Sequence, residues 1–423
     1  MAAGDAPETF GSKEGSAAAA GFKKMAESGR GLDFRTQNAE RRTQNAKQKG
    51  VCRRLSIHNK VFGKHEAVFL TVNLITARFF IGLQMDINRI TGTAAWLHIT
   101  YRYALAFLIF AALLWLFRPF EKGDLLDAAE TALGKFGKTA AGLVLAIFFI
   151  IKTAITLRYF TENLIAIMLN NSPYVFVAAF FVIAMSAAAY KGFLNIGRLA
   201  AVFVPVIITF SLLVLAAVFQ FYNPRNLLPI LGNGLRDNFT EGFLRVDLYS
   251  ELIVLFILAP EMADGRREFG RVCFTSLLVS FIIALLFTLS FNMLVSYPAD
   301  AKFTFPIYET ARLVRIGPFG QRLEVLATFA WNFSLLLYFS AGLSVTTKLI
   351  RKALDIDFSK PLIPVCAMII FLLSVYFHFS PEKWRQGTNM EDFWSKASWV
   401  VFPVLPAALL LLARMRKSTN NKQ

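Results

Sequence analysis

The side chains in this sequence that are best placed to do chemistry are ionisable groups inside long apolar segments. Glu251 follows Ser250 and stands directly before the apolar run Leu252–Leu258. Arg78 lies at a similar depth in an earlier apolar segment. A charge in the hydrocarbon of a membrane is costly unless it is paired or wetted. Each of these groups therefore marks a place where a ligand, a proton or an opposite charge is held.

Two interpretations of each charge remain open at this point. Glu251 either contacts a ligand, a proton or an arginine as part of the function, or belongs to a purely structural ion pair. The guanidinium of Arg78 either binds a ligand carboxylate through two hydrogen bonds or neutralises Glu251. With their neighbours, these residues give six candidate ligand-binding positions: Thr76, Ala77, Arg78, Tyr249, Ser250 and Glu251.

Two further pairs of opposite charges lie within or at the start of apolar segments. Arg158 and Glu162 are four residues apart, so on a helix they share a face and can pair. Arg322 and Glu324 open a later segment near a membrane interface. We interpret both pairs as structural or coupling ion pairs. Lys152 either extends toward an interface or lines a wet cavity, and the sequence does not decide between these.

Catalysis finds little support in the sequence. It contains no nucleophile elbow, P-loop, HExxH motif or dinucleotide-binding fingerprint. The four histidines are dispersed, and Cys52, Cys273 and Cys366 have neither CxxC spacing nor a histidine at metal-ligand spacing. We therefore expect no enzyme, no metal site, no cofactor and no disulfide framework.

The elements that must position these residues are membrane-spanning helices. Of the 423 residues, 56% are hydrophobic and only 17% are charged, whereas soluble domains carry about 25% charged residues. Nearly uncharged runs of about 20 residues recur, and that length lets a helix cross about 30 Å of hydrocarbon. We predict an all-α membrane protein with ten transmembrane helices at 66–83, 94–117, 140–169, 173–190, 195–221, 241–262, 269–297, 321–349, 361–379 and 394–414.

The first and sixth of these spans are poor continuous helices, because polar and charged residues interrupt them near their middle. They occupy equivalent places in two halves of five helices each. Since five is odd, the halves would have opposite orientations and form an inverted repeat. Interrupted helices at matching positions of two halves indicate a binding site in the middle of the membrane. The alternative is that each is an intact, slightly polar helix facing the bundle interior.

The net charge of +17 is distributed as membrane topology requires, and not as a nucleic-acid-binding face. Lys and Arg concentrate in the N-terminal tail and in alternate short loops. The positive-inside rule then places both termini in the cytoplasm, which agrees with an even number of spans. We expect a disordered basic cytoplasmic tail over residues 1–64, a membrane domain over 65–416 and a short cytoplasmic tail over 417–423.

Several short motifs follow one another in a fixed order along the chain. The loop before the sixth span reads Asn226-Leu-Leu-Pro229, and the span itself carries Ser250-Glu251. The other motif residues are Arg158, Phe160, Glu162, Pro173, Gly192, Arg198, Pro205, Asn233, Gly234, Phe305, Pro306, Arg312, Ile316, Gly317, Phe319, Arg322, Leu323 and Glu324. In this order and spacing, over residues 65–415, the chain resembles the spore germination permease family, the integral-membrane B subunits of nutrient germinant receptors.

The resemblance implies the fold of the amino acid–polyamine–organocation superfamily, with helices one and six unwound. It implies a subunit of the spore inner membrane that senses a small nutrient such as an amino acid. Its partners would be an A-type membrane subunit and a C-type lipoprotein, and no nucleic acid. This chain has Thr76, Ala77 and Arg78 where the family often has Gly or Ser, and Ser250 in place of Gly, so the identity of the nutrient is open.

Two other functions remain compatible with the sequence. The first is an amino-acid transporter coupled to Na⁺ or H⁺, with Glu251 as the proton-linked group. The second is an assembly subunit that binds no ligand and anchors the A-type and C-type components.

Overall fold

The computed structural model of the protein describes residues 62–81, 83–120, 123–244, 247–262, 265–299, 306–313, 323–356, 360–380 and 396–420. Over these ranges the chain is helical, apart from turns and an isolated parallel bridge between Phe62 and Met262. Residues 1–61, for which the sequence predicts a basic tail, lie outside the described part. The unit treated below begins at Phe62.

Seven helices of the described part are long and apolar enough to cross a membrane, so the protein is of the multi-pass membrane type. They include α4 (Ala95–Phe117), α5 (Leu125–Ile167), α7 (Phe193–Ala217), α10 (Gly265–Leu294), α12 (Leu323–Ala353), α13 (Leu362–Phe379) and the helix Lys396–Lys417, which contains most of α16 (Leu405–Asn420). The helix α6 (Tyr174–Tyr190) is apolar but has only 17 residues.

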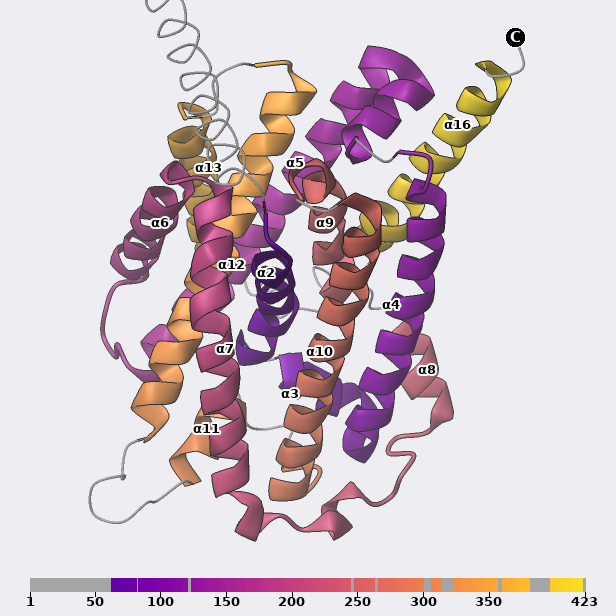
Figure 1. Ribbon diagram of the computed structural model, residues 1–423. Helices are drawn as coiled ribbons and strands as arrows, with labels where there is room; N and C mark the ends of the chain where they lie inside the picture. Colours follow the sequence, from indigo (N-terminus) through magenta and orange to yellow (C-terminus); the bar gives the residue numbers. More distant parts are fainter. Residues whose placement is uncertain are drawn as a thin grey trace, which may run out of the picture. The chain divides into compact units, whose positions relative to one another are not determined.

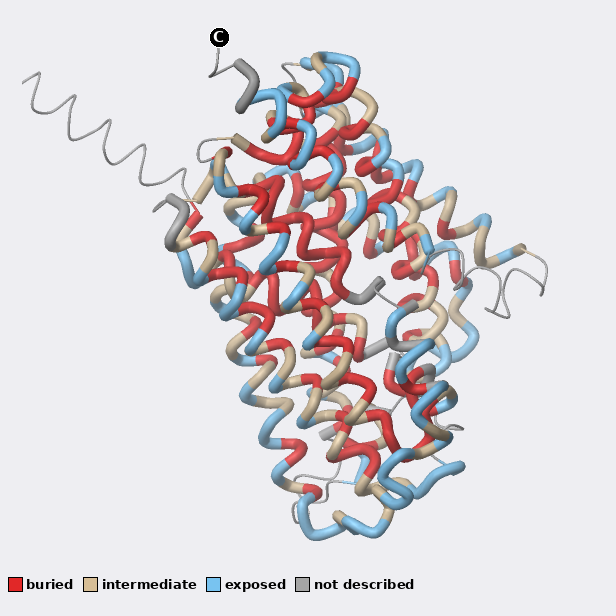
Figure 2. Tube along the Cα trace, turned by 90° about the vertical axis from the view of Figure 1, so that its right-hand side faces the viewer, coloured by how far each residue is buried: buried red, intermediate tan, exposed pale blue. Residues whose placement is uncertain are grey.

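The outer surface of the bundle is apolar in the way that a lipid environment requires. On α6, Phe176, Phe180 and Ile183 are exposed and are spaced so that they share one face of the helix. An apolar face of this kind is unfavourable in water and favourable against lipid. Figure 2 shows the buried residues in the interior of the bundle and the exposed residues along its outside.

The first predicted span is interrupted where the sequence suggested. The helix α2 (Lys64–Thr76) ends at Thr76, a 3₁₀ turn η1 (Ala77–Ile81) follows, and α3 (Leu83–Thr91) continues the chain. Every residue of α2 from Leu70 onward is buried, and a helix that is buried all round must be central. Figure 1 shows α2 in the middle of the bundle, and α7, α10 and α12 contact it.

The sixth predicted span is also divided into short pieces. It contains the end of α8 (Leu235–Leu244), the 3₁₀ turn η5 (Asp247–Leu252), the six-residue helix α9 (Ile253–Leu258) and the 3₁₀ turn η6 (Ala259–Glu261). All six residues of α9 are buried. The turn η5 contacts α2, so the two interrupted segments meet inside the bundle.

The start of α2 is joined to the end of the sixth segment. The backbone N–H of Phe62 donates to the carbonyl of Glu261 at 2.8 Å. The ring of Phe62 fills the space over Gly197 of α7, where a Cβ would lie only 2.5 Å from ring carbons. A side chain at position 197 would therefore displace Phe62, which explains the glycine there.

The third span is longer than predicted, since α5 begins at Leu125 and not near residue 140. The carboxylate of Asp124 caps its start by accepting the N–H groups of Leu126 at 2.9 Å and Asp127 at 3.0 Å. Gly134 adopts φ +74° and interrupts the regular helix. Charged residues in this first part hide it from a hydropathy pattern. The helix α11 (Pro306–Leu313) lies between the seventh and eighth predicted spans.

Candidate functional site

A buried ion pair lies where the interrupted sixth segment meets α5. The ammonium of Lys152 lies 2.7 Å from Oε1 of Glu251 and also donates to Oγ of Ser250. The hydroxyl of Tyr338, on α12, donates to the same Oε1 at 3.1 Å. Lys152 is 8% exposed and Glu251 is 2% exposed. Two helices, α5 and α12, thus converge on one carboxylate of the turn η5 (Asp247–Leu252).

The burial of this pair explains its geometry. A lone charge in a low-dielectric interior is very costly, so each member requires the other. The ring of Phe148, one turn earlier on α5, lies 5.5 Å from the Lys152 ammonium and stabilises it further. The second oxygen of Glu251, Oε2, is buried and accepts no hydrogen bond from the described residues. It is therefore an acceptor that a small bound molecule can use.

Tyr249 packs beside this pair against a second buried cation. Its ring lies edge-on to Tyr103 of α4, with the ring centroids 4.9 Å apart. The guanidinium of Arg102 lies 5.9 Å from the centroid of the Tyr249 ring. Arg102 is buried. It is not among the candidates named from the sequence, although its position inside the second apolar span indicates a buried charge that needs a partner.

The three candidate residues at the first break lie at the end of α2. The hydroxyl of Thr76 donates back to the carbonyl of Val72 at 2.8 Å. Ala77 is completely buried, and Arg78 is partly buried. The turn η1, which carries Ala77 and Arg78, contacts α12, and Glu251 is bonded to Tyr338 of the same helix.

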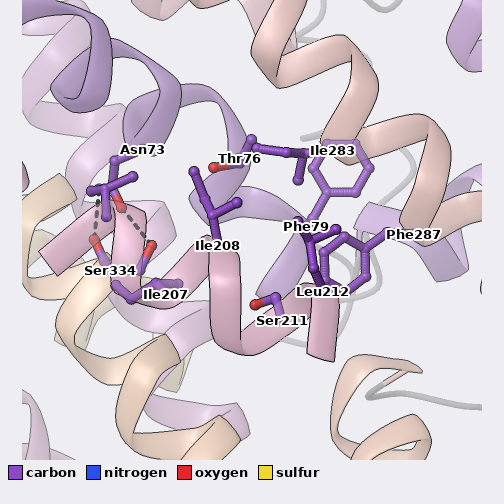
Figure 3. Close-up of a pocket in the computed structure, with 11 residues that line it drawn as sticks. Asn73, Thr76, Phe79, Ile207, Ile208, Ser211, Leu212, Ile283, Phe287 and Ser334 are labelled. Atoms are coloured by element: carbon purple, nitrogen blue, oxygen red, sulfur yellow. Dashed lines mark hydrogen bonds between the residues drawn. The ribbon is translucent and has the colours of Figure 1, made fainter. Parts of the chain in front are cut away.

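A small hollow of about 20 Å³, partly open to the outside, lies beside the first break. A hollow of this volume holds about one water molecule. Figure 3 shows side chains from α2, η1, α7, α10 and α12 around it. Its lining is Asn73, Thr76, Phe79, Val204, Ile207, Ile208, Ser211, Leu212, Ile283, Phe287 and Ser334. Thr76 is the one member of the predicted ligand-binding set among these residues.

The polar wall of the hollow is a reciprocal pair of hydrogen bonds. Asn73 Nδ2 donates to the Ser334 carbonyl at 2.9 Å, and Ser334 Oγ donates to Asn73 Oδ1 at 2.7 Å (Figure 3). Ser334 and Tyr338 are one helical turn apart on α12, so their backbones are about 6 Å apart along its axis. The helix α12 thus contributes both to the hollow, through Ser334, and to the Glu251 site, through Tyr338.

A family model described as "Spore germination protein" matches residues 62–381 of the chain. The chain belongs to the spore germination permease family. Spore germination protein KB of Bacillus subtilis (strain 168) is similar to it, with 20% identity over 362 residues, which cover 84% of this chain and 95% of that protein. The family is of the permease type.

A solved structure shares the fold of this member of the spore germination permease family. It is a substrate-bound, outward-open Na⁺-coupled sialic acid symporter, with a TM-score of 0.56 and 13% identity. The match covers 82% of this chain and 78% of the symporter. At this identity the likeness shows a transporter fold and nothing about substrate.

The predicted ion pair of Arg158 and Glu162 on α5 belongs to a second cluster of polar side chains, separate from the Glu251 site. Arg158 Nε donates to Glu162 Oε1 at 3.0 Å, and Nδ1 of His378 lies 2.7 Å from the same oxygen. The His378 ring stacks on Tyr174 at 3.9 Å, which links α5, α6 and α13. The arrangement joins three helices and contains no group of the Glu251 site.

The pair predicted at the start of α12 is only partly described. Arg322 lies outside the described residues. Glu324 is buried in the first turn of α12, and its carbonyl accepts the hydroxyl of Thr328 at 2.8 Å.

Two partners in the site of this spore germination protein were missed from its sequence. The sequence leaves Lys152 open between an interface and a cavity, and nothing in the sequence selects Tyr338 as a site residue. The available signal was charge balance, because a buried carboxylate requires a cation at its own depth. Arg78 and Lys152 both met that requirement, and spacing alone could not place either beside Glu251.

Proposed function

We propose that this chain is the integral-membrane subunit of a spore nutrient-germinant receptor, which binds a small nutrient such as an amino acid in the middle of the membrane. Membership of the spore germination permease family supports a role in germination. The observation that carries the binding role is the meeting of two interrupted helical segments at the buried Lys152–Glu251 pair. Irregular backbone at membrane depth is tolerated where it lines a cavity or a polar site.

The proposal includes ten spans arranged as two inverted repeats of five. The seven long apolar helices, the shorter α6 and the two interrupted segments supply ten elements. Both termini would lie in the cytoplasm, as the loop charges indicate. Such an architecture places the first and sixth segments at the centre of the bundle, where two halves can rearrange around a ligand.

The proposed ligand site consists of Thr76, Ala77, Arg78, Tyr249, Ser250 and Glu251. The hollow beside the first break holds about one water molecule, so a nutrient would enter there only as the surrounding helices move apart. The accepting oxygen Oε2 of Glu251 supports a contact with a ligand donor. Binding would favour one arrangement of α12 against the first break, and this shift in population would pass to the A-type and C-type partner subunits.

The experiment that tests this function begins with spores that lack the chain. Germination is measured in response to single L-amino acids and hexose sugars, with and without the restored gene. The proposal predicts at least one nutrient whose effect requires the gene and whose addition raises the melting temperature of the purified chain. If no nutrient changes that melting temperature while the deletion abolishes germination, the chain is an anchoring subunit.

A second candidate function is an amino-acid transporter coupled to an ion gradient. The observation that favours it is the fold likeness to a Na⁺-coupled symporter. The measurement is uptake of a labelled amino acid into proteoliposomes that contain the purified chain. Accumulation driven by a Na⁺ or H⁺ gradient supports transport, whereas saturable binding without accumulation supports the receptor.

A further inference from the structure

The ammonium of Lys152 contacts two oxygen atoms of the turn η5, and both are of the kind that cation sites use. It meets a carboxylate oxygen of Glu251 at 2.7 Å and the hydroxyl oxygen of Ser250, which precede α9 on the turn η5. Tyr338 supplies another hydroxyl to the same carboxylate oxygen. Carboxylate and hydroxyl oxygens are the donors that hard metal cations select. Here the cation at these oxygens is the ammonium of Lys152, which is covalently part of the chain.

The attachment of this cation is itself a structural feature. Lys152 extends from the middle of α5, the ring of Phe148 lies 5.5 Å from its ammonium, and the residue is 8% exposed. A dissolved cation at the position of the ammonium would have to displace it from Oε1 of Glu251. Because the ammonium is tethered, its effective concentration at Glu251 does not depend on the ionic composition outside.

We propose that Lys152 is a built-in cation, which supplies to Glu251 the positive charge that a dissolved monovalent cation would otherwise bring. The site therefore needs neither Na⁺ nor K⁺ in the native chain. Cutting the tether while leaving the carboxylate and the hydroxyls would turn it into a binding site for a small monovalent cation. This inference deepens the proposed function by making its central site independent of an ion gradient.

A purely structural ion pair would behave differently. Loss of Lys152 would then destabilise the protein by leaving Glu251 unpaired, and the loss would be the same whatever small cation was present. A built-in cation is replaceable, because the oxygen donors remain after truncation. Rescue by a dissolved cation is therefore the property that separates the two.

The test uses the purified full-length chain in detergent, at equal ionic strength, in the chlorides of Na⁺, K⁺, methylammonium or N-methyl-D-glucamine. Thermal unfolding and binding of radioactive Na⁺ are measured for the native chain, for Lys152→Ala and for Lys152→Ala with Glu251→Gln. The native chain is expected to melt at one temperature in all four salts and to bind no Na⁺ saturably. Lys152→Ala is expected to melt lower in N-methyl-D-glucamine and to recover in a saturable way with Na⁺ or methylammonium.

The double variant is expected to show no such recovery, because its carboxylate is gone. A control variant, Lys138→Ala, removes a lysine from another ion pair and should respond equally to all four salts. A specific Na⁺ effect on the native chain, or a Lys152→Ala chain that no small cation restores, would overturn the proposal. A Lys152→Ala chain that does not fold in any salt counts as a variant that no small cation restores. In that case the binding of Na⁺ to the native chain still tests whether the native site needs Na⁺.

No nutrient is used in this experiment, so its outcome is independent of the germination screen. A germinant that requires this chain, together with a native chain stabilised by Na⁺, would leave the proposed function standing and remove the built-in cation. If no nutrient requires this chain, while the native chain is indifferent to Na⁺ and Na⁺ restores Lys152→Ala, the built-in cation would stand and the proposed function would fall.

Discussion

Removing one member of the Lys152–Glu251 pair should destabilise the protein far more than removing both. The two side chains are 8% and 2% exposed, and their charged atoms are 2.7 Å apart. Breaking a buried pair by deleting one partner costs about 3–5 kcal/mol, because the remaining charge is buried without compensation. Replacing both charges with neutral groups of similar volume is often tolerated. Lys152→Met and Glu251→Gln should therefore each lower the free energy of unfolding by about 3–5 kcal/mol, and the double variant by less than either.

The assay is a double-mutant cycle on the purified full-length chain, unfolded by heat or denaturant in one detergent. A surface pair, Arg312 and Glu309 on α11, supplies the control, because its side chains are 56% and 32% exposed and 3.2 Å apart. Arg312→Gln and Glu309→Gln should each change the unfolding free energy by at most about 1 kcal/mol. The reasoning is refuted if the single variants at the buried pair change stability as little as the surface variants do. It is also refuted if the two single effects add in the double variant.

Three smaller predictions concern other contacts of the fold. Ser334→Ala leaves the buried Oδ1 of Asn73 without its donor, which should cost about 1–3 kcal/mol and lower the melting temperature; an unchanged melting temperature would contradict this. Gly342→Val should destabilise by about 1–3 kcal/mol in the same assay, since an added Cβ would lie 2.7 Å from a threonine oxygen of α5; native stability would show that the helices can separate without cost. The hydrogen bond from Lys138 holds the pKa of Asp355 below its usual range, so its stabilising effect is present at neutral pH and is lost as the pH falls below about 3.9. Asp355→Asn should therefore melt below the native chain at pH 7, with the difference vanishing in acid, and a difference that is constant with pH would count against the contact.

The apolar pattern was a reliable guide to the long helices. Runs of about 20 uncharged residues require helices in lipid, because no other open structure satisfies the backbone there. The pattern also located the interruption after Thr76 and the 3₁₀ turn that carries Ser250, since both contain polar residues inside apolar runs. It failed for the first part of α5, where a capped polar helix precedes the membrane segment.

The contacts of the site could be predicted only in part. Glu251 was recognised as a residue that needs a partner, because its burial follows from its place in an apolar run. The partner could not be identified, because Lys152 lies ninety-nine residues earlier and several cations lie at comparable depth. Which of them meets the carboxylate depends on how the helices pack, and packing angles are not written in a hydropathy pattern. The reciprocal bonds of Asn73 and Ser334 are hidden for the same reason.

The most direct test of the central claim is the nutrient dose–response of spores in which this chain carries Glu251→Gln or Arg78→Ala. Glu130→Gln serves as the matched control, because it removes the same charge from a partly exposed side chain outside the proposed site. The account predicts that Glu251→Gln and Arg78→Ala raise the nutrient concentration needed for half-maximal germination, while Glu130→Gln leaves it unchanged. Normal sensitivity of both site variants to every nutrient, with the chain present at its native level, would contradict a ligand site at the meeting of the two interrupted helices.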